Sequence, residues 1–489
     1  MIPTKRPKLD LLSEEFIEKI LQEALIVLEK TGIFIENKEA LDLFSDAGMK
    51  IDEKTQRVFV SPDLVEHSLS STPSVISLFD RTGEEEFIVG NDEVHFDPGS
   101  AAVAILDHKT QKQRKPVTKD LVEFVRLTDC LENIHFQSTG LVSGDVPEIL
   151  SDSYRLYIGL LYSSKPVITG TFRVKGFQPM YDMLVAIRGG QQALSEKPLA
   201  IFDACPSPPL KWSNLTTQSL IDCARAGIPS ELISMGLTGA TSPVTLGGTL
   251  VQHVAENLCG LVICQLANKG APVIFGGSPS SFDMRKGTTP MGAIETMMID
   301  SAYAQIAKHL NLPTHAYMGL SDAKIIDGQA GLETGIGAVL AALSGINVVS
   351  GPGMLNFESC QSLEKLVMDN EICGMAYRLI QGVSQRESPL AKDLFEGFSQ
   401  QTEFLTLDHT RKWYRQEHTY PKLIDRDTYD SWVSLGKKSL AERASEEVKK
   451  RLGENLPNML DQSQRQDLKQ IVFTDAKANG ISELPELPD

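Results

Sequence analysis

A repeated unit of strand, turn and helix is the feature that most restricts the folds open to this chain. Between about residues 94 and 380, a short apolar stretch, then Gly, Ser and Pro residues, then a helical pattern, occurs eight times. The predicted strands begin at residues 94, 134, 166, 199, 231, 272, 314 and 347. Successive starts are roughly 32 to 42 residues apart, which suits one strand and one helix per unit.

Eight such units predict a (β/α)₈ TIM barrel over residues 91–383. The run PVIF at residues 272–275 is apolar throughout, as expected of a parallel strand that is covered on both faces. A doubly wound open sheet is the alternative. However, none of the predicted strands is followed by the Gly-x-Gly-x-x-Gly loop that usually accompanies that fold.

The two ends of the chain lack this repeat. Residues 1–90 predict an N-terminal extension of helices with a hairpin at residues 75–89, where Arg81, Thr82 and Gly83 form the turn. Residues 384–489 are charged and predict a C-terminal helical extension, with one helix at residues 439–452. The tail from Asp461 is polar, and we expect it to fray.

Composition excludes several classes of protein. The 64 acidic and 47 basic residues give a net charge of −17, which argues against nucleic acid or an anionic membrane as a partner. The N-terminus has no apolar signal segment, and no run of about 18 apolar residues is present to span a membrane. Seven cysteines without a Cys-x-x-Cys pair are typical of reduced, buried thiols. We therefore expect a cytoplasmic protein.

The alternation of side chains along each strand predicts which residues face the barrel lumen. Apolar residues must point outward to the helices, so the polar face of a strand points inward. This rule places Phe96, Phe136 and Phe202 against the helices. The residues assigned to the lumen are His95, Asp97, His135, Gln137, Asp203, His315 and Tyr317.

Histidine and aspartate in a lumen are the usual ligands of a catalytic zinc ion, so a metal-dependent barrel hydrolase is one hypothesis. Its candidate ligands are His95, His135, His315, Asp97 and Asp203. No His-x-His pair occurs on any predicted strand, and hydrogen-bonded histidines are the simpler interpretation. Gly-x-Ser-x-Gly is also absent, which disfavours a nucleophile-elbow hydrolase.

The loops that follow the strands carry aromatic and basic residues at the expected active-site end of the barrel. Trp212, Phe282, Tyr317 and Phe357 lie at or beyond strand ends, where they can surround a cationic ligand or simply pack. The basic residues Lys211, Arg285 and Lys324 occur in the same loops. They can bind a carboxylate, or pair with acids such as Asp283 and Asp322.

Three segments resemble the trimethylamine methyltransferase (MttB-type) family of corrinoid-dependent methyltransferases. They are GTLVQHVAENLCGLVICQLANKGAPVIFGGSPSSFDMRKGTTPMGAIE, SDAKIIDGQAGLETG and HTRKWYRQEHTYPKLIDR. The resemblance implies a TIM barrel that moves a methyl group from an amine to the Co(I) cobalamin of a separate corrinoid protein. Founding members carry pyrrolysine in the lumen, with its equivalent here expected near residues 317–324. This chain has only the standard twenty residues, which implies the branch that demethylates quaternary amines.

The resemblance implies glycine betaine as substrate and dimethylglycine as product, with proline betaine or carnitine as alternatives. A quaternary nitrogen already carries its charge, so it leaves as a neutral amine without being protonated. The site then has to hold the cation, anchor its carboxylate and aim one methyl group outward. We assign the cage to Tyr317, Phe282, Phe357 and Trp212, the anchor to Arg285, Lys324 and His315, and supporting polar roles to Asp283 and Gln329.

This hypothesis expects no metal site and no tightly bound cofactor in this subunit, because the cobalamin belongs to the corrinoid protein. It also expects a homo-oligomer. A non-catalytic protein that binds a betaine and docks a corrinoid protein is a third hypothesis.

Overall fold

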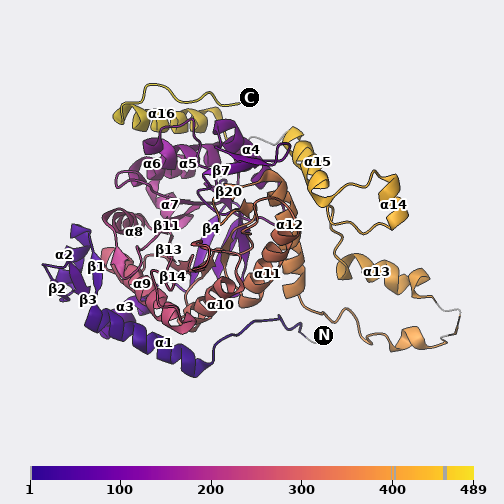
Figure 1. Ribbon diagram of the computed structural model, residues 1–489, viewed down its shortest axis with the longest axis horizontal. Helices are drawn as coiled ribbons and strands as arrows, with labels where there is room; N and C mark the ends of the chain where they lie inside the picture. The colour runs from indigo at the N-terminus through magenta and orange to yellow at the C-terminus, as the bar shows by residue number, and fades with distance from the viewer. Residues whose placement is uncertain (1–2, 398, 401–402, 455–459, 489) are drawn as a thin grey trace.

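Parallel strands lie at the centre of the computed structural model, which describes residues 3–397, 399–400, 403–454 and 460–488 (Figure 1). They form a five-stranded sheet in the order β15-β13-β11-β10-β9 and a three-stranded sheet in the order β17-β18-β6. Their bounds are β6 (His95–Asp97), β9 (Gln137–Ser138), β10 (Val167–Gly170), β11 (Ala200–Ala204), β13 (Ser230–Ser234), β15 (Val273–Gly277), β17 (His315–Ala316) and β18 (Val348–Ser350). These strands match the eight that the repeat predicts.

Backbone contacts join the two sheets at both of their junctions. On one side, Phe275 in β15 forms a parallel β-bridge with Thr314, the residue before β17. On the other side, the carbonyl oxygen of Phe96 in β6 accepts the N–H groups of His135 and Phe136 at 2.9 and 3.3 Å. The strand arrangement is therefore mixed α/β and resembles a TIM barrel.

Helices cover the outer face of these strands (Figure 1). They are α4 (Thr118–Asp129), α5 (Ser151–Tyr162), α6 (Phe177–Arg188), α7 (Gln191–Glu196), α8 (Asn214–Ala226), α9 (Leu246–Ala267), α10 (Ile294–His309), α11 (Gly328–Ser344) and α12 (Leu363–Ile380), with a 3₁₀ turn at Glu148–Leu150 before α5. By length and composition alone α9 is able to cross a membrane, but 78% of its apolar window is buried inside the structure. The helix is apolar because it lies in the core.

An N-terminal hairpin plugs the end of the lumen where the strands begin. Strands β4 (Val75–Phe79) and β5 (Glu86–Gly90) pair antiparallel, as the sequence predicts. Their buried side chains pack with one inward residue from each of several central strands. This cluster, which we call the plug, contains Ile76, Leu78, Phe87, Val89, Phe136, Ile168, Ile201, Ile274 and Val348.

The plug corrects the predicted orientation of β9. Phe136 points into the lumen, where its ring lies 5.4 Å from that of Phe87 and 4.9 Å from that of His95. Gln137 pairs in register with Val167, which packs with the outer core, so Gln137 points outward. The alternation rule failed because an apolar hairpin covers this end of the lumen, so an inward residue here has to be apolar.

The other N-terminal elements pack outside the strands. They are α1 (Glu14–Ile26), a π-helical turn (Val27–Thr31), β1 (Ile33–Ile35), α2 (Lys38–Asp46), β2 (Lys50–Asp52), β3 (Arg57–Phe59) and α3 (Pro62–Ser71). Both α1 and α3 contact α9. Strand β1 pairs with β12 (Lys211–Trp212), which belongs to the loop after β11, so this extension is joined to the central fold by a sheet.

Small sheets form at the opposite end, from the loops that follow the central strands. The loop after β6 contributes β7 (Ala104–Asp107) and β8 (Lys112–Arg114), which join β19 (Met354–Leu355) and β20 (Cys360–Gln361) from the loop after β18. Likewise, β14 (Leu237–Thr238) pairs with β16 (Ser280–Ser281). These pairs hold the loops together around the C-terminal ends of the strands, which we call the mouth.

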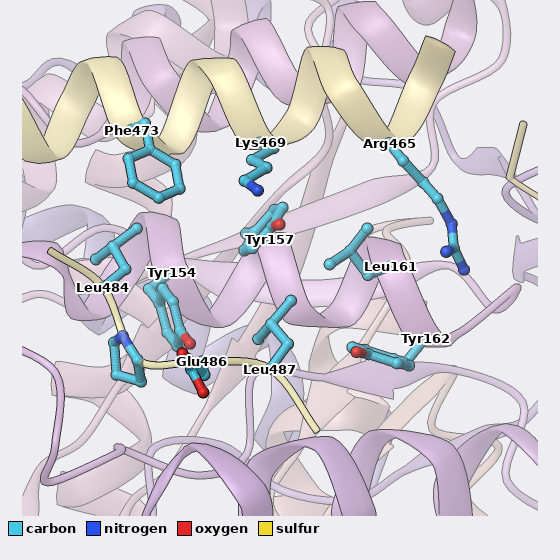
Figure 2. Close-up of a pocket in the computed structure, with 11 residues that line it drawn as sticks. Tyr154, Tyr157, Leu161, Tyr162, Arg465, Lys469, Phe473, Leu484, Glu486 and Leu487 are labelled. Carbon is cyan, nitrogen blue, oxygen red and sulfur yellow. The ribbon is translucent and has the colours of Figure 1, made fainter. Parts of the chain in front are cut away.

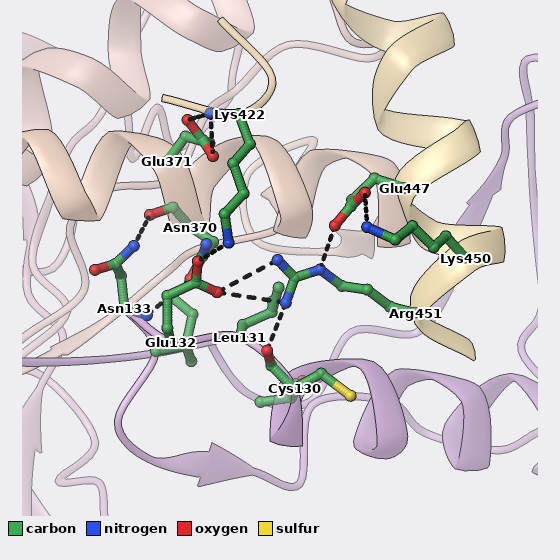
Figure 3. Close-up of polar contacts among 12 residues, drawn as sticks. Cys130, Leu131, Glu132, Asn133, Asn370, Glu371, Lys422, Glu447, Lys450 and Arg451 are labelled. Atoms are coloured by element: carbon green, nitrogen blue, oxygen red, sulfur yellow. Dashed lines mark hydrogen bonds and ion pairs between the residues drawn. The ribbon is translucent and has the colours of Figure 1, made fainter. Parts of the chain in front are cut away.

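The C-terminal extension first leaves the central fold and then returns to it. Its helices are α13 (Asp408–Glu417), α14 (Tyr429–Ser434), α15 (Leu440–Gly453) and α16 (Gln462–Ala478), with 3₁₀ turns at Lys392–Phe395 and Phe404–Thr406. The segment with α13 and α14 extends away from the strands (Figure 1). Where the chain returns, Arg451 forms ion pairs with Glu132 and Glu447, and Lys422 also pairs with Glu132 (Figure 3).

The predicted fraying of the tail is wrong. Helix α16 begins immediately after Asp461, whose side chain caps it. Its buried face consists of Leu468, Val472 and Ala476. Asp475 forms an ion pair with Arg173. The sequence is polar overall because only one narrow face of this helix is covered.

Candidate functional site

Three carboxyl groups lie close together in the lumen, above the plug and toward the mouth. They are Asp97 on β6, Asp203 on β11 and Glu231 on β13, and we call them the acid layer. The register places Asp203 directly beside Glu231 and Asp97 beside Ser350 of β18. Asp97 and Glu231 are fully buried, whereas Asp203 is partly accessible. Four different strands thus bring their polar side chains to one level.

A hydroxyl group connects Asp97 to a lumen histidine. Ser350 Oγ donates to Asp97 Oδ2 at 2.6 Å, and His315 Nε2 lies 3.0 Å from the same hydroxyl oxygen. Because a hydroxyl has one proton to donate, this order requires His315 to donate its Nε2–H to Ser350. His315 Nε2 also lies 3.7 Å from Glu231 Oε1, so the histidine lies between two acids.

Several polar atoms of this layer have no hydrogen-bond donor or acceptor among the residues that the structure describes. They are Asp97 Oδ1, Asp203 Oδ1, both carboxyl oxygens of Glu231, and His315 Nδ1. Asp203 and Glu231 lie side by side in register, and burial together with the neighbouring Asp203 raises the pKa of Glu231. Buried polar atoms without partners are rare in folded proteins and here point to a ligand site.

Burial controls the protonation of the layer. It raises the pKa of Asp97, Asp203 and Glu231, and mutual repulsion of the acids raises the pKa of Asp97 and Glu231 further. Burial also lowers the pKa of His315 to about 3. Both effects of burial favour the uncharged forms of these groups.

Three further residues border the acid layer on the side of the mouth. Burial and the acids raise the pKa of the Cys205 thiol, the Tyr317 hydroxyl and the Glu358 carboxyl group. The Tyr317 ring lies edge-on to that of His315 at 4.9 Å, and its hydroxyl is 2.8 Å from Ser100 Oγ. Of the predicted cage and anchor residues, Tyr317 and His315 therefore lie at the layer.

Glu358 is positioned by an unusual loop. Asn356, Phe357 and Glu358 all have positive φ angles, of 53°, 57° and 65°. Three consecutive non-glycine residues in the left-handed region are strained, and such strain tends to cluster at functional sites. Hydrogen bonds between Asn356 and Ser359 hold the turn.

Two predicted site residues contact each other at the rim of the mouth. Lys324 Nζ lies 3.7 Å from the centroid of the Phe357 ring and donates to the carbonyl oxygen of Asp322. The Lys324 side chain is exposed. The cation that occupies this ring in the structure is thus the protein's own lysine.

The loop after β15 carries three more of the predicted residues. Phe282 is half-buried, and its N–H donates to Thr238 Oγ1. The Arg285 side chain is 86% exposed and forms an ion pair of 2.8 Å with Asp283 in the same loop. An anchoring role for Arg285 would require this loop to turn toward the lumen. Gln329 is exposed at the start of α11, where it donates to Glu333.

The predicted cage position of Trp212 is wrong. Its side chain is 0% exposed and packs beside Gly260 of α9 and Leu232. The indole N–H donates to the carbonyl oxygen of Glu256 at 3.2 Å. An aromatic residue after a strand was assigned to the mouth, but Trp212 belongs to β12, which pairs with β1, and its ring packs against α9. Lys211, its neighbour, forms an ion pair with Glu36.

The histidines proposed as metal ligands have separate protein partners. His95 Nδ1 lies 2.8 Å from His135 Nδ1, and His95 Nε2 is bonded to the Ile88 carbonyl of the plug hairpin. His135 also stacks on Tyr377 of α12. His315 forms a hydrogen bond with Ser350 instead. In the described ranges, no group of three or more His, Cys, Asp and Glu residues is arranged to hold a metal ion.

The sequence-based assignment missed Glu231 and Ser350. Glu231 is the one charged residue of β13, Ser-Glu-Leu-Ile-Ser, and is level with Asp203 on the preceding predicted strand. That combination was a usable signal. Gly276 was also overlooked: a Cβ atom there would lie 2.9 Å from His315 Cβ, so the absence of a side chain leaves room for the imidazole.

A separate cavity of about 510 Å³ lies outside the central strands, between α5, α16 and the chain after it (Figure 2). Tyr154, Tyr157 and Phe473 line it together with Arg465 and Lys469. None of these residues belongs to the acid layer. The cavity is therefore a gap on the outer surface rather than part of the lumen site.

Comparison with known proteins gives one family. Residues 1–480 match the family model described as trimethylamine methyltransferase (MTTB). A trimethylamine methyltransferase MttB of Desulfitobacterium hafniense is 34% identical over 470 residues, covering 96% of this chain and 95% of the relative. A glycine betaine methyltransferase of another strain is 31% identical over 457 residues, covering 93% and 95%.

A solved structure has a related fold. The monomethylamine methyltransferase MtmB of Methanosarcina barkeri aligns with a TM-score of 0.51 at 14% sequence identity, covering 89% of this chain and 91% of that one. At this identity the likeness concerns the fold alone.

Proposed function

Because this chain belongs to the trimethylamine methyltransferase (MTTB) family, we propose that it transfers a methyl group from a small methylated amine to the Co(I) cobalamin of a separate corrinoid protein. The observation that carries this proposal is the acid layer, in which Asp97 and Asp203 lie near the C-terminal ends of the parallel strands β6 and β11, with Glu231 beside Asp203. Catalytic groups of TIM barrels lie at that end. The proposal includes one closed (β/α)₈ barrel, formed by the two sheets through their bonded junctions.

The acid layer fits a quaternary ammonium group as the methyl donor. When the N–CH₃ bond breaks, its electron pair stays on nitrogen, and the amine leaves as a neutral tertiary amine. The reaction therefore needs no proton donor at the nitrogen. What remains for the protein is to hold the cation and to direct one methyl group toward the mouth, and such positioning accounts for much of the rate of many enzymes.

Aromatic side chains complete the cation site in this proposal. Tyr317 stands at the layer, and Phe282 and Phe357 lie in loops of the mouth. A cation over an aromatic face gains on the order of 0.5–2 kcal/mol. Lys324 now occupies the Phe357 ring, so a ligand at that ring has to displace it.

Glycine betaine is one candidate substrate, supported by the relative of that name at 31% identity. Proline betaine and carnitine carry the same type of cationic nitrogen. A carboxylate on any of them needs a donor, and the candidates are Arg285, Lys324 and His315, with Asp283 and Gln329 in supporting roles. Of these, His315 is at the acid layer, and to anchor a carboxylate it would have to give up its hydrogen bond to Ser350.

The corrinoid protein is the expected partner, and it carries the cobalamin. We propose no tightly bound cofactor in this subunit, a cytoplasmic location, and assembly into a homo-oligomer.

Methyl transfer is tested by mixing the protein with its corrinoid partner, reduced to Co(I), and a series of methylated amines. The cobalamin absorption spectrum should change from that of Co(I) to that of methylated cobalamin with at least one quaternary amine. An unchanged spectrum with all of them would reject the proposal. Binding of a quaternary amine without spectral change would instead favour a non-catalytic binding protein.

A further inference from the structure

The acid layer and its surroundings contain more acid groups than basic ones. Glu358 adds a fourth carboxyl group to Asp97, Asp203 and Glu231, and besides burial both Asp203 and Asp97 raise the pKa of Glu231 and of Glu358. The cation that stabilises an acid of this layer is Arg155 on α5, which acts on Asp203. Four carboxyl groups therefore face one guanidinium group.

Arg155 already has partners within the protein. Its Nε donates to the Ser151 carbonyl at 3.0 Å, and its Nη1 donates to the Thr139 carbonyl at 2.6 Å. The guanidinium also lies 4.4 Å from the centroid of the Phe172 ring. These contacts fix Arg155 as part of the wall. A ligand carboxylate that paired with Arg155 would have to displace these contacts, and it would also lie beside the carboxyl group of Asp203.

We propose that the acid layer is a cation-exchange site: it binds a quaternary ammonium compound that has no carboxylate in preference to a zwitterion, and it releases a proton when that cation binds. This inference rests on the proposed function, since it specifies the substrate class of the same site. Tyr317 and His315 supply the uncharged part of the site, and the unpartnered oxygens of Glu231 and Asp203 supply its charge.

The physical cause is that the ligand cation replaces the positive charge of a proton held by the acids. In the empty layer the acid oxygens are buried without partners, and burial raises the pKa of the acids and so favours their protonated forms. An opposite charge within about 4–6 Å lowers an acid's pKa, so a bound cation drives out a proton. A zwitterion gains less, because its own carboxylate meets the same acids.

The imidazole, thiol and hydroxyl groups that face the layer, of His315, Cys205, Tyr317 and Tyr303, stay uncharged near neutral pH, whereas Glu358 and Asp300 are further carboxyl groups. Burial lowers the pKa of His315 to about 3 and raises the pKa of Cys205, Tyr317 and Glu358. Of these, Glu358 is itself an acid that can give up the proton, and Arg155 stays charged. The pH dependence of binding thus reports on the acids.

Choline and glycine betaine form a matched pair of ligands, because both carry a trimethylammonium group on a two-carbon chain and only one has a carboxylate. Calorimetric titration of the full-length protein, without the corrinoid protein, should show choline binding at least about tenfold more tightly. Repeating the titration in two buffers with different ionisation enthalpies measures proton release. If one proton leaves per ligand, the affinity for choline should rise by about tenfold per pH unit in the range where the acid is protonated.

Glu231→Gln tests the assignment, because the amide keeps the shape but cannot become an anion. It should weaken choline binding by at least about tenfold and abolish or reduce proton release. Glu256→Gln is the matched control: Glu256 is buried outside the layer, where Ser234, Leu210 and Gln252 already donate to it. This control should leave the affinity and the proton count unchanged.

Tighter binding of glycine betaine, or binding of choline without proton release, would overturn the inference while leaving methyl transfer from a betaine possible. These two results need only the unaltered protein, so they hold even if a variant fails to fold. Absence of binding by any methylated amine, together with an unchanged cobalamin spectrum, would instead reject the proposed function itself.

Discussion

The two ends of the lumen differ in chemistry although the same strands build both. At the N-terminal end, the plug consists of aliphatic and aromatic side chains that pack against one another. Two residues farther along the strands, the inward positions change to Asp203, Ser350 and Asp97. An acid at the closed end would lose water without gaining a ligand, whereas at the mouth a ligand can replace the lost water.

This contrast explains why the site can face one way only. The β4–β5 hairpin closes one end with apolar packing, so a ligand and a protein partner must approach through the loops of the mouth. Substitutions at the two ends should therefore have separable effects: stability at the plug, and binding and methyl transfer at the acid layer.

Phe136→Ala should have the largest effect, and it should act on stability. Phe136 is 0% exposed and fills the plug between Phe87 and His95. Removing a buried phenylalanine costs about 3–5 kcal/mol, as lost burial plus a cavity. Denaturant unfolding should show this loss, while the variant that remains folded keeps its methyl-transfer rate within about threefold. Phe282→Ala, at the half-buried mouth position, is the control for stability. A large loss of activity in folded Phe136→Ala would contradict the separation of the two ends.

Asp203→Asn should lower methyl transfer and leave the stability of the protein almost unchanged. Asparagine keeps the size and hydrogen-bonding capacity of the side chain but cannot become an anion. A hydrogen bond or ion pair to a charged group contributes about 1.5–3 kcal/mol, so kcat/KM should fall by about 100-fold with little change in unfolding. Methylation of the corrinoid partner, followed by its spectrum, measures the change. Asp222→Asn on α8, outside the lumen, should leave kcat/KM as it is. An equal fall in both variants would remove Asp203 from the site.

Acid should weaken the closed end of the lumen through its histidine pair. Burial, with repulsion from His95 and Lys165, lowers the pKa of His135 to about 3. The unfolded chain binds a proton at about pH 6.5 and the folded chain does not, so stability is complete above pH 6.5 and is lost as the pH falls toward 3. At pH 5 the loss should be about 2 kcal/mol.

Comparing unfolding of the parent protein and His135→Gln at several pH values isolates this contribution, because the variant cannot take up the proton. Its stability should fall less steeply between about pH 6.5 and 5. The exposed His67 on α3 is the control, and His67→Gln should leave the pH dependence unchanged. Identical slopes for the parent and His135→Gln would show that this histidine pair does not govern acid sensitivity.

The local pattern of the sequence was sufficient to predict the strands and much of the lumen. Alternation on β6 and β11 correctly placed His95, Asp97 and Asp203 inward, because polar side chains there have no other place between the helices and the lumen. The same rule misplaced Phe136, since the hairpin that covers it lies far earlier in the chain. Orientation depends on what covers a strand, and a single strand does not carry that information.

The site was harder to predict than the fold. Trp212, Arg285 and Gln329 were chosen because their residue types suit a cationic or anionic ligand and because they follow strand ends. In the structure Trp212 is buried against α9 in a strand paired with β1, while Arg285 and Gln329 face solvent. Glu231 was missed because it was taken as the first residue of its strand, although its position level with Asp203 follows from the parallel register. Loop residues depend on long-range contacts, whereas strand residues depend on register.

Arg285→Ala should have the smallest effect, and it tests whether the rim of the mouth belongs with the lumen. Its side chain is exposed and its partner is Asp283 in the same loop. Exposed ion pairs contribute little, so KM for the preferred amine should change by less than about twofold. The adjacent Lys286→Ala is the matched control, since it removes a charge from the same loop. A steep rise in KM for Arg285→Ala alone, larger for glycine betaine than for choline, would mean that the loop turns inward and supplies a carboxylate anchor. That outcome would extend the binding site from the acid layer to the rim and would make the site suited to a zwitterion.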